Sequence, residues 1–285
     1  MFFLILSILF SVTVGVIFKV GRKYALNTTQ IVAWNYVFAL LLCYFFFSPD
    51  LSVIDTSAPW SIYIPLGILL PTVFLFLAAS IKHMGIVKTD AAQRLSLFIP
   101  ILAAWLIFNE EFNGIKLIAF LMALPALLLI LSKKNDNPNN KWVYPAVVLV
   151  GFGVIDILFK QIALTTSLPF TTSLFIVFGI SLIVILAVVL YEMAFKKAQF
   201  KSNNLLFGAL IGVFNFGNIL FYLKAHQAFA KNPSTVFAAM NMGVIIIGSI
   251  VGIVVFKEKV SRCNYFGLLL AIVAIVLIAF SQVLT

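Results

Sequence analysis

Ten long apolar runs, separated by short polar segments, dominate this 285-residue sequence. A helix needs about 20 apolar residues to cross a bilayer. Since lipid cannot hydrogen-bond backbone groups, and the runs lack the alternation of barrel strands, we expect helices. The sequence therefore predicts an all-α integral membrane protein with ten transmembrane helices, at residues 2–20, 29–48, 61–81, 89–108, 113–131, 142–164, 168–191, 204–224, 233–256 and 263–283.

The overall composition supports the same fold class. Charged residues make up only 10% of the chain, too few to cover the surface of a soluble domain of this size. The first run, 2–20, has no basic leader and no small-residue cleavage motif, so we interpret it as a span rather than a signal peptide. Asn232 and Pro233 are typical of a helix start, as a cap followed by a first-turn proline.

The ten spans divide into two groups of five that match each other. The polar linker 133–140 separates a first repeat, residues 1–132, from a second repeat, residues 141–285. Three pairs of segments match in the same order: Val14–Lys19 with Ile155–Lys160, Val73–Ala79 with Ile219–Ala225, and Phe108–Glu111 with Phe256–Lys259. Because five is odd, the second repeat must enter the membrane upside down. The predicted architecture is therefore two inverted five-helix repeats.

The charges in the loops agree with this inversion. Arg22 and Lys23 follow the first span, whereas residues 163–170, after the sixth, carry no cation. Cations gather in the loops after odd-numbered spans, so the positive-inside rule places these loops in the cytoplasm and both termini outside. This orientation signal accounts for the net charge of +10, and no nucleic-acid partner is predicted.

Together these features resemble the EamA-like branch of the drug/metabolite transporter superfamily. The resemblance covers nearly the whole chain and includes a lysine ending the first span of each half, Lys19 and Lys160, and a glutamate after the fourth span, Glu110 and Glu258. It implies a secondary transporter, a permease that more often exports than imports small metabolites or drugs. It also implies a plasma membrane location, in bacteria the inner membrane, and both termini in the cytoplasm. The loop charges here predict the reverse orientation.

The segment Gly15–Lys19 is also similar to the end of the first helix in the small multidrug resistance branch. That branch carries a membrane-embedded glutamate eight residues before the lysine, where it exchanges protons for cations. Ser11 and Phe152 stand at the two corresponding positions here. The resemblance therefore does not supply the acid for proton-coupled cation exchange.

Polar side chains inside the spans are costly in lipid and mark a predicted substrate cavity. Asp156 and Lys160 lie one turn apart, where they form either a substrate-charge or proton site or a buried ion pair. The amides either line the cavity or hydrogen-bond between helices, and the lysines and Arg94 either contact substrate or extend to the interface. The candidate residues are Asp156, Lys160, Asn215, Asn218, Tyr222, Gln93, Asn241, Trp34, Asn35, Arg94 and Lys19.

Other residues carry weaker expectations. Glu110 is expected to be solvated or to cap a helix, and His83 and His226 are expected at the membrane interface, since both lie near span ends. Two cysteines, Cys43 and Cys263, give neither a disulfide framework nor a metal-ligand spacing. We expect no metal and no cofactor.

Catalysis is not predicted, because the zinc-protease, phosphate-loop and nucleophile-elbow motifs are all missing from the sequence. The alternatives to a transporter are a non-transporting membrane scaffold and a lipid-modifying membrane enzyme. The expected partners are a small-molecule substrate and the lipid bilayer, with protons as a candidate coupling ion. The protein is expected to be a monomer or a homodimer.

The predicted orientation can be tested with reporter fusions. Alkaline phosphatase fused to the C-terminus is expected to be active, because the loop charges place that end outside the cytoplasm. The same enzyme fused within residues 133–140, on the predicted cytoplasmic side, serves as the matched control and is expected to be inactive. The reverse pair of activities would show that the charge argument is wrong.

Overall fold

The computed structural model describes residues 1–21, 24, 26–52, 54, 58–84, 92–93, 95–110, 113–131, 141, 143–164, 168–257 and 262–281. Over these ranges the regular secondary structure is entirely helical. The helices are α1 (Phe2–Gly21), α2 (Thr28–Phe47), α3 (Trp60–Met84), α5 (Phe98–Leu106), α6 (Gly114–Leu131), α7 (Val143–Leu164), α8 (Phe170–Lys196), α9 (Ser202–Ala228), α10 (Pro233–Val254) and α11 (Arg262–Ser281).

Seven of the described helices are long and apolar enough to cross a membrane: α1, α2, α3, α7, α8, α9 and α10. They correspond to seven of the predicted spans. The other three predictions, 89–108, 113–131 and 263–283, overlap α5, α6 and α11, and the first and the last of them include residues outside the described ranges. The all-helical membrane class is therefore confirmed, and the number of crossings remains a prediction.

Helix α8 is longer than predicted, because it continues past residue 191 to Lys196. The prediction stopped where charged residues begin. In the structure the charges are accommodated in the last turn, where Lys196 Nζ lies 3.4 Å from Glu192 Oε1, one turn earlier. Lys197 caps the end of the helix, because its left-handed backbone directs its N–H to the Glu192 carbonyl.

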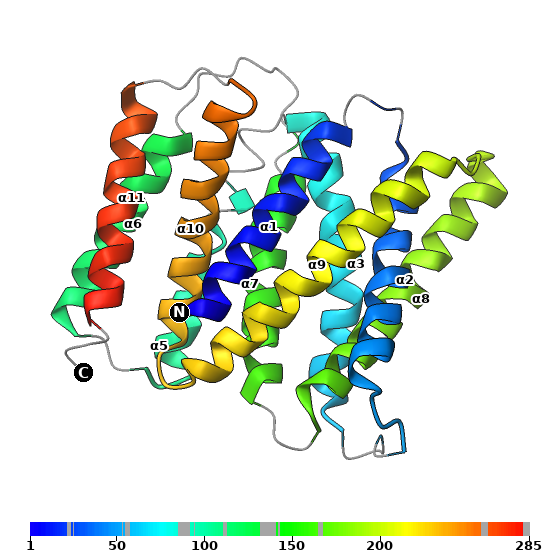
Figure 1. Ribbon diagram of the computed structural model, residues 1–285, viewed down its shortest axis with the longest axis horizontal. Coiled ribbons are helices and arrows are strands. Elements are labelled where there is room, and N and C mark those ends of the chain that lie inside the picture. Colours follow the sequence, from blue (N-terminus) through cyan, green and yellow to red (C-terminus); the bar gives the residue numbers. More distant parts are fainter. Residues whose placement is uncertain are drawn as a thin grey trace.

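Helices from the two halves of the chain pack against each other (Figure 1). In the bundle α1 contacts α9 and α10, α2 contacts α8 and α9, and α3 contacts α7 and α8. At one edge α6 packs along α11, while α5 contacts α7 and α10. Two ends of the bundle can be named by their lysines: the Lys19 end, where α1 and α10 finish, and the Lys160 end, where α7 and α9 finish and α10 begins.

The backbones of α2 and α9 approach closely through glycines spaced one turn apart in α9. A Cβ added at Gly212 would lie 2.8 Å from the carbonyl oxygen of Asn35, and one at Gly208 would lie 3.0 Å from that of Ile31. Such small-residue spacing permits tight helix contacts in lipid, where packing rather than the hydrophobic effect holds helices together.

We predict that Gly212→Ala destabilises the purified protein by about 1–3 kcal/mol, because the new methyl group meets backbone atoms that cannot rotate away. A lower midpoint of thermal unfolding in detergent would report this loss. Gly179→Ala in α8 is the matched control, since a Cβ there meets nothing within 4 Å. Equal midpoints for the two variants would contradict the tight α2–α9 contact.

Candidate functional site

A cavity of about 630 Å³ lies within the bundle, a volume typical of small-molecule sites. Five helices supply most of its wall: α1 from Ser11 to Lys19, α3 from Leu70 to Ala78, α7 from Phe152 to Phe159, α9 from Asn215 to Tyr222, and α10 from Met240 to Gly252. The cavity extends from Phe159 and Tyr222 to Lys19, Thr28 and Phe256, which lie at the Lys19 end.

Most of the predicted polar residues meet in this cavity. Its wall includes Lys19, Gln93, Asp156, Asn215, Asn218, Tyr222 and Asn241. Trp34, Asn35 and Lys160 are not part of the wall, and Arg94 lies outside the described residues. Sequence reasoning did not select Thr28 or Ser96 as site residues, and it noted Ser11 only as a replacement for a family glutamate; all three line the cavity.

Asp156 is the acid of this wall, and its environment differs from that of Lys160. The hydroxyl of Tyr222 donates to Asp156 Oδ1 at 2.8 Å, and the residue is half-buried at the wall of the cavity. The Lys160 side chain is fully buried and donates to the carbonyls of Ala230, at 3.0 Å, and His226, at 3.4 Å. The two residues thus bond separate partners, and within the described structure they do not form the ion pair that their spacing allowed.

Asn215 and Asn218 of α9 line the cavity and also hydrogen-bond to other helices. The two roles considered for these amides, cavity lining and interhelical bonding, are therefore both present. Asn215 Nδ2 donates to Asn35 Oδ1 at 3.1 Å, and Asn218 Oδ1 accepts from Ser7 Oγ at 2.8 Å. Asn35 therefore orients Asn215 from behind the wall. Trp34 packs over Gly208, and its ring makes an edge-to-face contact with that of Phe200.

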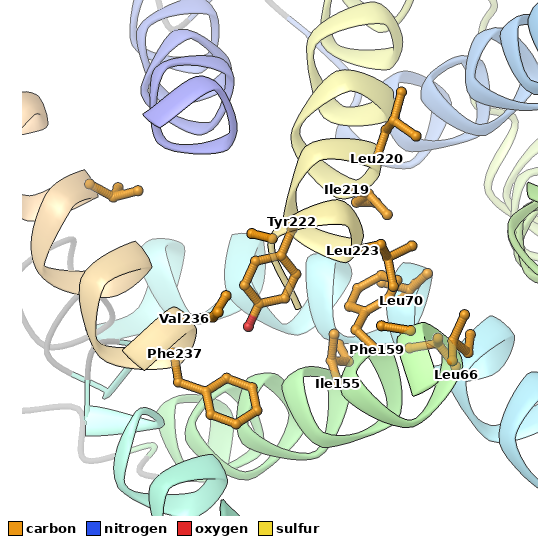
Figure 2. Packing of buried hydrophobic residues seen from close by; sticks show 14 of the residues in the cluster. Leu66, Leu70, Ile155, Phe159, Ile219, Leu220, Tyr222, Leu223, Val236 and Phe237 are labelled. Carbon is orange, nitrogen blue, oxygen red and sulfur yellow. The ribbon is translucent and has the colours of Figure 1, made fainter. Parts of the chain in front are cut away.

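The cavity is closed at the Lys160 end by four aromatic rings, Phe159, Tyr222, His226 and Phe237, here called the aromatic plug. Neighbouring rings lie in contact, with centroids 6.2 Å apart for Phe159 and Tyr222, 4.6 Å for Tyr222 and His226, and 4.8 Å for His226 and Phe237. Figure 2 shows Phe159, Tyr222 and Phe237 projecting from three helices into the same space. His226, predicted at the interface, is instead fully buried.

A buried polar cluster lies beyond the plug, at the start of α10. Glu110 Oε2 accepts the Ser234 backbone N–H at 2.8 Å, and Oε1 accepts the Ser234 hydroxyl. Lys116 Nζ lies 2.5 Å from Glu110 Oε1 and also donates to Asn232 Oδ1 at 3.2 Å. The carboxylate thus satisfies a free N–H of the first turn, where the helix dipole favours negative charge.

These bonds refine two predictions. Glu110 does cap a helix, although it is buried rather than solvated. Helix α10 begins at Pro233 as predicted, but Asn232 makes no side-chain cap bond, and Glu110, distant in sequence, caps the helix. Among the described residues, no group of three His, Cys, Asp or Glu side chains is placed to hold a metal ion.

Long apolar helices around an internal cavity whose mainly apolar wall carries several polar side chains define a multi-pass membrane protein with a small-molecule site. Residues 1–132 match the family model of the EamA-like transporter family. An uncharacterized protein of Haemophilus influenzae is 42% identical over 283 residues, with 95% of each chain covered. One solved crystal structure shares the fold with a TM-score of 0.74 at 14% identity, over 98% of this chain and 96% of that one.

The chain belongs to the EamA-like transporter family. It is accordingly a membrane transporter of the drug/metabolite type, and the family resemblance of the sequence is confirmed.

The aqueous character of the cavity can be tested by thiol labelling. In a Cys43→Ser, Cys263→Ser background, Ser11→Cys is expected to react with a water-soluble methanethiosulfonate about tenfold faster or more than Ile183→Cys, because only a hydrated thiol ionises to the reactive thiolate. Ile183 is the matched control, since it is 70% exposed but on an apolar outer surface. Equal rates would show that water does not fill the cavity.

Proposed function

We propose that the protein is a secondary transporter that binds a small metabolite or drug in this cavity and moves it across the membrane by alternating access. The observation that carries the proposal is the asymmetry of the cavity. It reaches Lys19 and Phe256 at one end, whereas at the other the aromatic plug and the buried cluster at Glu110 close it. A transporter caught in one of its two states has this form.

The proposal includes an internal duplication, with residues 1–132 and 141–285 as inverted repeats. The helix contacts support it when α1, α2, α3, α5 and α6 are matched with α7, α8, α9, α10 and α11. If each helix is replaced by its counterpart, the contacts of α1 with α9 and α10 become contacts of α7 with α3 and α5. The structure contains all four contacts. The pairs α2–α8, α5–α10 and α6–α11 join a helix to its own counterpart.

Asp156 is proposed as the substrate-charge or proton site. It is partly exposed to the cavity and lies one turn after Phe152, the position where the small multidrug resistance branch carries its glutamate. Residues four apart share a helix face, so the carboxylate points into the same space from one turn further along.

The proposed direction is export, on family grounds, and the proposed membrane is the bacterial inner membrane.

A thermal-shift screen against fractionated metabolite pools is expected to find ligands that raise the unfolding midpoint of the purified protein, because a ligand that binds only the folded state stabilises it. The same screen with Asp156→Asn is expected to lose the shift. Asp50→Asn, which changes an exposed acid outside the cavity, is the control expected to keep it. A shift that survives Asp156→Asn would place the ligand elsewhere.

We further predict that Asp156→Asn reduces the flux of such a ligand into proteoliposomes by about tenfold or more, the factor that corresponds to about 1.4 kcal/mol of lost interaction. Insertion and thermal stability should change little, because asparagine can still accept the Tyr222 hydroxyl. A scaffold would be indifferent to this substitution. Unchanged flux would remove Asp156 from the mechanism.

A further inference from the structure

Lys19 and Lys160 occupy matched positions at the ends of α1 and α7, but they lie in opposite environments. Lys19 lines the cavity, with its Nζ 4.0 Å from the centroid of the Phe256 ring. Lys160 is fully buried against the carbonyls that end α9. A cation is favourable there because the C-terminus of a helix carries partial negative charge.

Three separate elements hold the turn between α9 and α10, residues 229–232, and the start of α10 in place. Lys160 of α7 bonds the carbonyl of Ala230. Glu110, after α5, holds the Ser234 backbone, and Lys116 of α6 joins Glu110 to Asn232. We call Lys160, Glu110, Lys116, Asn232 and Ser234 the clamp. It ties α10 and α9 to helices from both halves of the chain.

The residues behind the plug continue the cavity wall toward the clamp. On α7 the lining residues Phe152, Ile155, Asp156 and Phe159 lead, at helical spacing, to Ala163. On α10 the lining residues Val244 and Met240 lead in the same way to Phe237. Ala163 and Phe237 are both buried. The faces of α7 and α10 that line the cavity therefore continue behind the plug as buried surfaces, toward the clamp.

We propose that the clamp is the closed gate of this transporter, and that it opens when Lys160 leaves the α9 carbonyls and turns toward the cavity, the arrangement that Lys19 already has at the other end. In the alternate state the two lysines exchange environments. This inference rests on the proposed transport function and names the bonds that must break for the second state to form.

The cavity and the clamp are connected through two helices. Asp156 and Lys160 lie one turn apart on α7, while Tyr222 and His226 lie one turn apart on α9. A ligand that binds Asp156 through Oδ1 competes with the Tyr222 hydroxyl, which donates to that oxygen. Displacing that hydroxyl moves a ring of the plug that contacts His226, whose carbonyl accepts from Lys160. Occupancy of the site thereby weakens the clamp.

The gate can be tested without any substrate, using single-cysteine reporters in the Cys43→Ser, Cys263→Ser background in detergent. Thr28→Cys reports the Lys19 end and Ala163→Cys reports the path behind the plug. A charged maleimide is expected to label Thr28→Cys and to leave Ala163→Cys protected, because Thr28 lines the cavity and Ala163 is buried.

Opening the clamp is expected to reverse this pattern. Glu110→Gln, and the milder Ser234→Ala, each remove hydrogen bonds to a charged group, so the labelling rate of Ala163→Cys should rise about tenfold or more, and that of Thr28→Cys should fall. Lys196→Gln is the control expected to change neither rate, since this lysine lies on the exposed end of α8 and pairs only with Glu192 among the described acids.

Two outcomes would overturn the proposal. If both clamp variants keep the wild-type unfolding midpoint and leave the two rates unchanged, the clamp is not a gate. If both reporters become faster together, the clamp maintains packing and does not exchange states. The labelling experiment needs no ligand, so it is independent of the flux experiment with Asp156→Asn. A negative result in one of the two experiments does not change the interpretation of the other.

Discussion

Hydrocarbon offers no hydrogen-bond partner, so polar groups inside a membrane bundle are stabilised when they find one within the protein. This constraint explains how the two halves are joined. Asn204 of α9 donates to Gln30 of α2 at 2.6 Å, and the Tyr63 hydroxyl of α3 lies 2.7 Å from the Ser173 hydroxyl of α8. Each bond connects a helix before residue 132 to one after 141, because the helices of each half pack mainly on the other half.

The same constraint separates the residues of the cavity from those of the clamp. In the clamp, Glu110 and Lys116 are almost completely buried, and each bonds more than one partner. A buried charge with its partners removed is strongly unfavourable, so such a cluster is held together or opened as a unit. In the cavity, Asp156 accepts a bond from the Tyr222 hydroxyl within the described part of the chain, and the residue remains half-buried. Its carboxylate therefore keeps acceptor capacity for a ligand.

Lys19 and Lys160 show that the two ends of the cavity differ, because one lysine lines the cavity and the other is buried. Two matched residues at opposite ends of an otherwise similar arrangement cannot both be buried if the cavity reaches one end only. The structure buries Lys160 against α9 and leaves Lys19 at the wall of the cavity. In the proposed inverted repeat, this asymmetry distinguishes one access state from the other.

The sequence by itself determined the membrane class, the positions of the long helices, and most of the polar residues in the cavity wall, because residues such as Asp156, Asn215 and Asn241 are conspicuous in apolar runs. Helical spacing also placed Asn215, Asn218 and Tyr222 on one face, and all three line the same wall. The tertiary structure alone decided which partners these groups bond. Lys160 bonds carbonyls 66 and 70 residues away rather than the nearby Asp156, and Glu110 caps a helix that begins more than a hundred residues later. The spacing of residues along one helix determines which of them share a face. The burial of a side chain and its distant partners depend on where other helices end, and a short sequence pattern carries no information about that.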